Sequence, residues 1–129
     1  MIAIDTNVLV RFLTRDDKIQ HARAEKIFRN ESIFIPDTVF LETEWVLRFS
    51  YGYQPDAVFT SFKKLLGLPH VYVEDPDLLL KAIEWHETGL DFADALHLAA
   101  SRECETFATF DTVLIKRAKG LTKCKVKKP

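Results

Sequence analysis

Short apolar runs alternate along the chain with longer segments in which apolar residues recur at helical spacing, and this alternation restricts the fold most. Buried strands that alternate with helices are typical of a mostly parallel sheet with helices on both faces. The expected strands cover residues 1–4, 33–35, 71–73 and 106–109, with a further edge strand around residues 122–126. The expected helices cover residues 7–13, 17–29, 37–49, 56–66, 77–88, 91–104 and 113–118. Because no repeat or long linker interrupts this order, we predict one α/β domain over residues 1–129.

Composition places the chain among ordinary globular proteins, with 129 residues, 47% hydrophobic residues and a net charge of -1. No apolar run approaches the roughly 20 residues of a membrane span. Asp5 and Asn7 interrupt the segment where a signal peptide would have its apolar core. Two cysteines are too few for a disulfide framework. We therefore expect a cytoplasmic protein.

Four carboxylates stand in positions that suggest chemistry. Asp5 and Asp111 each follow an expected strand, Glu42 interrupts the apolar side of a helix, and Asp94 lies in an otherwise apolar helical segment. In parallel sheets, ligands bind outside the carboxyl ends of the strands, where Asp5 and Asp111 fall. Several carboxylates at one place would repel one another unless a cation were present. Since Mg²⁺ prefers carboxylate oxygens and leaves positions open for phosphate, the pattern indicates a metal-dependent phosphodiesterase.

Each aspartate also has a structural reading. Asp5, Asp91 and Asp111 stand where helix N-caps are expected, and Asp94 would be an acidic residue in the first helical turn. Taken singly, Asp5 is open between cap and ligand, and Asp111 favours the cap. We expect Asp91 mainly to cap its helix and Asp94 to face inward toward a metal.

Helical geometry separates Glu42 from Glu44. At about 100° per residue, Glu42 shares a side with Trp45 and Phe49. Glu44 lies on another side, four residues before Arg48, which is the spacing of a surface ion pair. We therefore expect Glu42 to be buried and either functional or held in a structural salt bridge to an interior arginine, and Glu44 to be exposed.

Four motifs in order then resemble the PIN-domain family, and most closely its VapC-type toxins. They are IDTNVLV at residues 4–10, LETEWVL at 41–47, DFADALHLA at 91–99 and TFD at 109–111. The resemblance implies an α/β/α sandwich with a short parallel sheet and an endoribonuclease that depends on Mg²⁺ or Mn²⁺. It carries the family's acidic positions to Asp5, Glu42, Asp94 and Asp111. The residues implied to support this site are Thr6, Asn7, Asp91 and Thr109.

The resemblance also implies partners. VapC-type toxins of type II toxin–antitoxin systems are typically homodimers that cut RNA and are held inactive by a small VapB-like antitoxin. We expect such an antitoxin to place an arginine or lysine in the acidic pocket and to dock on aromatic side chains around Phe12, Phe28 and Trp45. The cations that follow residue 115 either meet RNA phosphates or are simply solvated. They are Lys116, Arg117, Lys119, Lys123, Lys125, Lys127 and Lys128. The alternative function is a non-catalytic PIN-fold module whose acidic pocket only binds.

Overall fold

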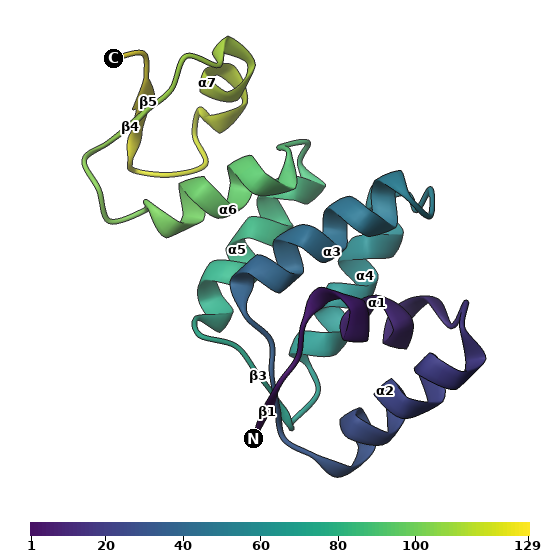
Figure 1. Ribbon diagram of the computed structural model, residues 1–129. Helices are drawn as coiled ribbons and strands as arrows, with labels where there is room; N and C mark the ends of the chain where they lie inside the picture. The colour runs from purple at the N-terminus through teal and green to yellow at the C-terminus, as the bar shows by residue number, and fades with distance from the viewer. The chain divides into compact units, whose positions relative to one another are not determined.

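The computed structural model describes residues 1–129, which form an N-terminal unit of residues 1–76 and a C-terminal unit of residues 77–129 (Figure 1). Strands and helices alternate through both units, as expected. The N-terminal unit contains β1 (Ile2–Ala3), α1 (Thr6–Thr14), α2 (Lys18–Asn30), β2 (Ile33–Phe34), α3 (Asp37–Phe49), α4 (Pro55–Leu66) and β3 (Val71–Tyr72). The C-terminal unit contains α5 (Pro76–Glu87), α6 (Phe92–Ala100), β4 (Thr106–Ala108), α7 (Thr112–Ala118) and β5 (Lys125–Lys127). Pro76, the first residue of α5, is the last residue of the N-terminal unit.

The strands of the N-terminal unit form a parallel sheet in the order β1-β2-β3. Ile33 in the central strand pairs with Ile2 on one side and with Val71 on the other. Backbone bonds continue past the strand ends, with Ile4 N–H donating to the Phe34 carbonyl at 3.2 Å. The chain therefore leaves β1 directly into Asp5 and the start of α1.

The core of the N-terminal unit lies between this sheet and its helices. Ile33 and Ile35 are fully buried, as are Phe40 in α3 and Phe62 in α4. The Phe40 and Phe62 rings meet edge to face with centroids 5.1 Å apart, a favoured aromatic geometry. Helix α1 packs against α2 and α3, and α3 packs against α4. These contacts fix α1 and α3, the two helices that carry Asp5 and Glu42 at or near their first turns.

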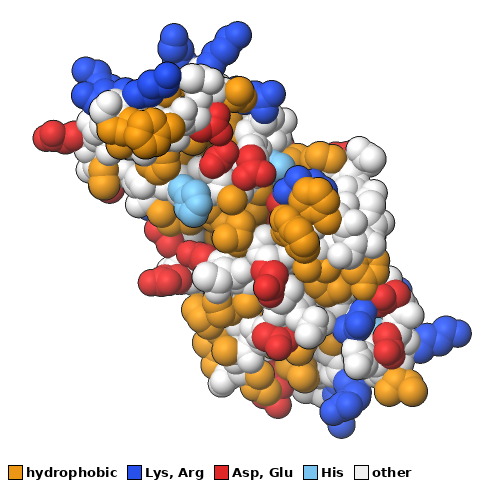
Figure 2. All heavy atoms as spheres, turned by 45° about the horizontal axis from the view of Figure 1, so that its top comes forward, with side chains coloured by type: hydrophobic (Ala, Val, Ile, Leu, Met, Phe, Trp, Pro, Cys, Tyr) orange, Lys and Arg blue, Asp and Glu red, His pale blue; other side chains and the backbone are white.

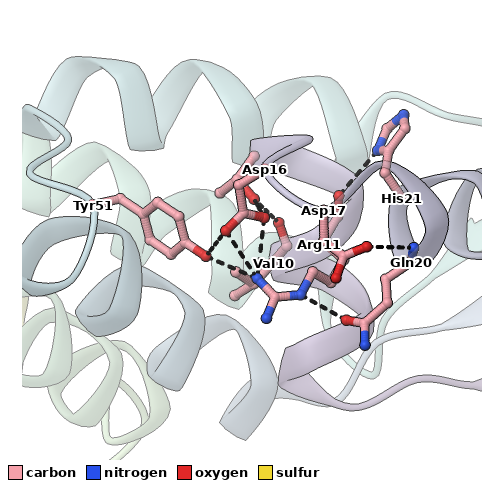
Figure 3. A network of polar contacts seen from close by, with 8 residues as sticks. Val10, Arg11, Asp16, Asp17, Gln20, His21 and Tyr51 are labelled. Carbon is pink, nitrogen blue, oxygen red and sulfur yellow. Dashed lines mark hydrogen bonds and ion pairs between the residues drawn. The ribbon is translucent and has the colours of Figure 1, made fainter.

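A polar network joins α1 to the turn that follows α3 (Figure 3). Arg11 Nη1 donates to both Asp16 carboxylate oxygens and to Tyr51 Oη, each at 3.0 Å. Tyr51 Oη in turn donates to Asp16 at 2.6 Å, and Thr14 Oγ1 donates to it at 2.8 Å. These hydrogen bonds, first that of Tyr51 and then that of Thr14, lower the pKa of Asp16 to about 2, and the charge of Arg11 adds to them. The network thus ties together segments that are 40 residues apart in the sequence.

In the C-terminal unit, β4 and β5 pair in parallel, with Phe107 opposite Val126. The expected strand near the end of the sequence is therefore present, but β4 and β5 form a two-stranded sheet of their own, so the expectation of one sheet for all strands was wrong. Leu79 and Ile83 in α5 and Phe92 and Leu98 in α6 are fully buried.

Two expected helix ends differ from the structure. Asp37 is the first residue of α3 and makes no capping bond, because the chain is already turned by Pro36, whose carbonyl accepts from Val39 N–H at 3.0 Å. Helix α6 ends at Ala100 and not near residue 104. Ser101 Oγ donates back to the His97 carbonyl at 2.8 Å, which occupies an acceptor at the helix end.

None of the helices combines the length and the apolar character that a membrane crossing requires.

The network predicts how stability responds to pH. Because the folded pKa of Asp16 is depressed, its ionised form stabilises the fold above the ordinary value of 3.8, and this contribution is lost as the pH falls toward 2. Tyr51→Phe removes the hydrogen bond that contributes most to the lowered pKa of Asp16. The Tm of this variant should therefore lie below that of the wild type at pH 7, and the difference should shrink as the pH falls. Tyr53→Phe is the matched control, since the Tyr53 ring packs on Tyr51 but its hydroxyl is outside the network. Equal Tm losses in both variants would contradict the role given to Tyr51.

Candidate active site

The first hollow of the candidate site lies in the N-terminal unit and measures about 360 Å³. It is lined by Asp5, Thr6, Asn7, Thr38, Val39 and Glu42. Asp5 is the N-cap of α1, and its Oδ1 accepts from Val8 N–H at 3.2 Å. This single capping bond leaves the second carboxylate oxygen of Asp5 without a protein donor. Three predicted residues of the first motif and Glu42 from the second therefore share one hollow.

Glu42 and Glu44 have the opposite exposure to the one expected. Glu42 is exposed, as are Trp45 and Phe49 at 54% and 60%, whereas only 2% of Glu44 is exposed. The expected i,i+4 pair does form, with Arg48 Nε 2.8 Å and Nη2 3.2 Å from the two Glu44 oxygens. It is a half-buried bidentate pair that compensates the burial of Glu44 and not a pair on the surface. The prediction that Glu42 is buried was wrong, yet Glu42 faces the hollow that holds Asp5.

The second hollow lies in the C-terminal unit and measures about 160 Å³. It is lined by Leu90, Asp91, Asp94, Asp111, Val113, Leu114 and Arg117. Asp91 caps α6 by accepting from Asp94 N–H at 3.3 Å. Asp111 caps α7 through Oδ1, which accepts from Val113 and Leu114 N–H at 2.9 and 3.1 Å. The capping role expected for both residues is confirmed.

Thr109, one of the expected supporting residues, positions Asp111. Its Oγ1 accepts a hydrogen bond from Asp111 N–H at 3.0 Å, at the point where the chain leaves β4. The backbone of Asp111 is therefore fixed by Thr109, and its side chain is fixed by the start of α7.

Asp94 is the carboxylate with the most unfavourable surroundings in this hollow. It is half-buried, and burial raises its pKa, with the negative charges of Asp91 and Asp111 adding to the effect and His97 opposing it. The carboxylates of Asp91, Asp94 and Asp111 are thus close enough to repel one another. Such repulsion would be relieved by a bound cation.

The predicted carboxylates therefore fall into two groups, one in each unit. Asp5 and Glu42 share the N-terminal hollow, and Asp91, Asp94 and Asp111 share the C-terminal one. All are oxygen donors of the kind that Mg²⁺ and Mn²⁺ prefer. Neither unit by itself groups three or more Asp, Glu, His or Cys side chains closely enough to hold a metal ion. The donor chemistry of each hollow fits a hard cation.

Two lining residues had no role in the expected site. Thr38 belongs to the first turn of α3, one turn before Glu42. Arg117 was counted only among the C-terminal cations, but it lines the hollow of Asp94 and Asp111. Its i,i+4 spacing from Val113 on α7 was the signal available in the sequence, since both side chains lie on one helix face.

The expected aromatic docking residues differ in exposure. Phe28 is only 3% exposed, so its assignment to a docking surface was wrong. It is buried because its ring stacks on half-buried Phe12, with centroids 3.9 Å apart, between α1 and α2. Trp45 is exposed and lies beside Phe49, with centroids 5.0 Å apart.

Parallel strands followed at once by aspartate-capped helices define an α/β protein with carboxylates at its strand ends. The family model of the PIN domain matches residues 2–120, across both units. The chain therefore belongs to the PIN domain family, and the predicted family and fold are confirmed.

Among solved structures, the chain is similar to VapC20 of Mycobacterium tuberculosis, described as a toxin that cleaves the sarcin-ricin loop. The two sequences are 23% identical, the match covers 97% of this chain and 99% of the other, and the TM-score is 0.46. No curated protein matches the chain.

The different surroundings of Glu42 and Glu44 predict different effects on stability. Glu44→Gln loses the charge of a buried partner of Arg48, and charged hydrogen bonds are worth about 1.5–3 kcal/mol. Glu42→Gln changes an exposed side chain and should shift the free energy of unfolding by less than about 0.5 kcal/mol. Urea unfolding of both variants measures the difference. If Glu42→Gln is the more destabilised of the two, the burial assigned to these residues is contradicted.

Proposed function

We propose that the protein is a metal-dependent endoribonuclease that acts as the toxin of a type II toxin–antitoxin system. Asp5, Glu42, Asp94 and Asp111 are its proposed catalytic carboxylates. Thr6, Asn7, Asp91 and Thr109 are the proposed supporting residues. The proposal rests on membership of the PIN domain family together with the four ordered acidic motifs.

The observation that supports the choice of residues is the lining of the two hollows. All four carboxylates line a hollow and keep an oxygen that no protein group binds. In Asp5 and in Asp111, one carboxylate oxygen accepts a hydrogen bond from a backbone N–H at the start of the next helix, and this bond orients the carboxylate.

The proposed reaction is hydrolysis of an RNA phosphodiester bond. A water attacks phosphorus in line with the leaving oxygen, so that the new phosphorus–oxygen bond replaces the old one. The water proton passes to a carboxylate or to solvent, and the leaving oxygen takes up a proton from solvent. The role of the capped aspartates is to hold negative oxygens in fixed positions, so that little reorganisation is needed during the reaction.

Mg²⁺ or Mn²⁺ is the proposed cofactor, held by Asp5, Asp94 and Asp111, with Glu42 binding directly or through water. When bound, the cation would neutralise phosphate charge and acidify the attacking water. The raised pKa of Asp94 fits this role, since the unfavourable charge around it would be relieved by a cation.

Charge removal without loss of the caps tests this proposal. Asp5→Asn, Asp94→Asn and Asp111→Asn should each lower cleavage of labelled RNA by more than about 100-fold, because even an outer-shell partner of a metal is worth roughly 10–100-fold. EDTA should abolish the wild-type activity. Asp17→Asn is the matched control, since Asp17 caps α2 in the same way, accepting from Gln20 N–H at 3.0 Å, but lies in neither hollow. Asn is as good an N-cap as Asp, so the Asp5, Asp111 and Asp17 variants should fold, and Asp94→Asn leaves the Asp91 cap of α6 in place.

Asp94→Asn also has a readout that does not depend on cleavage. Because the pKa of Asp94 is raised in the folded state, its ionised form opposes folding, fully so above the raised value and not at all below 3.8. The variant should therefore have the higher Tm at pH 7, with the gain vanishing in acid. Mg²⁺ should raise the Tm of the wild type and not of the variant. Full cleavage by any of the three variants would contradict the carboxylate assignment, and binding of RNA without cleavage by the wild type would favour the non-catalytic module.

The proposed partners are a second copy of the chain and a small VapB-like antitoxin. An arginine or lysine of the antitoxin would enter the acidic site, where a guanidinium satisfies carboxylates in the place of a metal. Trp45 and Phe49 offer exposed aromatic surface on α3, the helix that also carries Glu42, and are suited to the apolar part of the contact.

Substitution on each side separates these two contributions. Alanine in place of the basic residue of the antitoxin should weaken neutralisation and leave binding, because the apolar contact persists. Trp45→Ala in the toxin should weaken binding and leave cleavage intact. Titration calorimetry and the cleavage assay measure the two effects. Unchanged antitoxin affinity for Trp45→Ala would remove α3 from the proposed interface.

A further inference from the structure

Arg117 is a cation at a carboxylate hollow that is not paired with any carboxylate. It lines the hollow with Asp91, Asp94 and Asp111, yet its one hydrogen bond runs from Nη1 to the carbonyl of Gly89, at 2.6 Å. A guanidinium has five N–H donors in a planar fork. Most of the donors of Arg117 are therefore unused, although acceptors of opposite charge line the same hollow.

The carbonyl that holds Arg117 belongs to a fixed turn. Gly89 follows α5 with a φ of 115°, a conformation that favours glycine. Leu90 N–H closes the turn by donating to the Trp85 carbonyl at 3.2 Å, and Gly89 N–H donates to the His86 carbonyl at 3.0 Å. The guanidinium is thus held by a backbone carbonyl. This bond uses one of its N–H donors and leaves its positive charge without a counter-charge.

The cations that surround Arg117 in the sequence have the same character. From residue 112 to the last residue the chain contains 7 Lys or Arg and no Asp or Glu. Lys116 and Lys119 beside Arg117, and Lys125 and Lys127 on β5, are exposed and form no ion pair. Figure 2 shows Lys and Arg side chains gathered over the C-terminal unit. Residues 112–129 contain no acidic residue that could pair with these cations.

We infer that Arg117 binds a phosphate of the RNA substrate at the edge of the C-terminal hollow, with the exposed lysines of α7 and β5 contacting the phosphates beyond it. An RNA strand approaching Asp91, Asp94 and Asp111 meets repulsion, which an uncommitted guanidinium at the same hollow offsets. Arginine suits this place because its fork donates to two phosphate oxygens at once. The inference rests on the proposed ribonuclease function and adds the residue that positions its substrate.

The test measures RNA binding apart from cleavage. Asp94→Asn provides the cleavage-blocked background, in which the affinity for a short labelled single-stranded RNA is measured over a range of salt concentrations. Adding Arg117→Ala should weaken binding about tenfold, the worth of one charged hydrogen-bonded contact. It should also reduce the salt slope by about 0.7, the value for one phosphate contact on a single strand. Arg117→Lys keeps the charge and should recover part of the affinity.

Arg29→Ala in the same background is the matched control. It removes one positive charge from an exposed arginine of the N-terminal unit that is already paired with Glu25. Its affinity and salt slope should match the background, and thermal unfolding checks that all variants fold. If Arg117→Ala binds RNA as tightly and with the same slope as the background, the role of Arg117 is overturned and the ribonuclease function stands. If the wild-type chain neither binds nor cleaves RNA, the proposed function fails and this inference fails with it.

Discussion

The hydrogen bond from a helix-start amide to an aspartate is the interaction on which both the fold and the candidate site depend. Asp5 begins α1 directly after β1, and Asp111 begins α7 directly after β4. Asp91 begins α6 after the glycine turn that ends α5. Each bond satisfies amides that would otherwise lack a partner and fixes a carboxylate at the start of the next helix. The positions of Asp5, Asp91 and Asp111 thus follow from how the chain passes from strand or turn to helix.

Much of the fold could be predicted from the sequence because its determinants are local. Short apolar runs such as 33–35 have no room for a helix, and Gly67 and Asp17 mark helix boundaries in the expected way. A further strand around residues 122–126 was expected from the same reasoning, and β5 forms close by at Lys125–Lys127, although it is only three residues long. The cap at Asp37 was misplaced because Pro36 had already turned the chain.

The burial of α3 could not be predicted in the same way, because its apolar residues do not all face the core. Phe40 and Leu47 are fully buried, whereas Trp45 and Phe49 are exposed. The comparison of helix sides therefore predicted burial for Glu42, although Glu44 is the buried glutamate. The guanidinium of Arg48 lies 4.4 Å from the centre of the Phe49 ring and also donates to the carboxylate of Glu44. This ion pair lets the charged side chain of Glu44 lie on the buried side of α3. Only tertiary packing decides which of two apolar sides of a helix is covered. The place of Arg117 in the C-terminal hollow was not predicted for a related reason. The carbonyl of Gly89, which accepts its hydrogen bond, lies 28 residues earlier in the chain.

The capping role of the aspartates has a consequence for how such a protein can lose its activity by mutation. Asp and Asn codons differ by one base, and the two side chains cap a helix about equally well. For a protein that harms its own cell when unopposed, as proposed here, this opens a short evolutionary path to an inert copy. A single Asp5→Asn or Asp111→Asn change would keep the amide partners of α1 or α7 and thus the folded surface. An inactive copy of this kind would still bind the antitoxin. An active toxin encoded elsewhere and held by the same antitoxin would then be less inhibited.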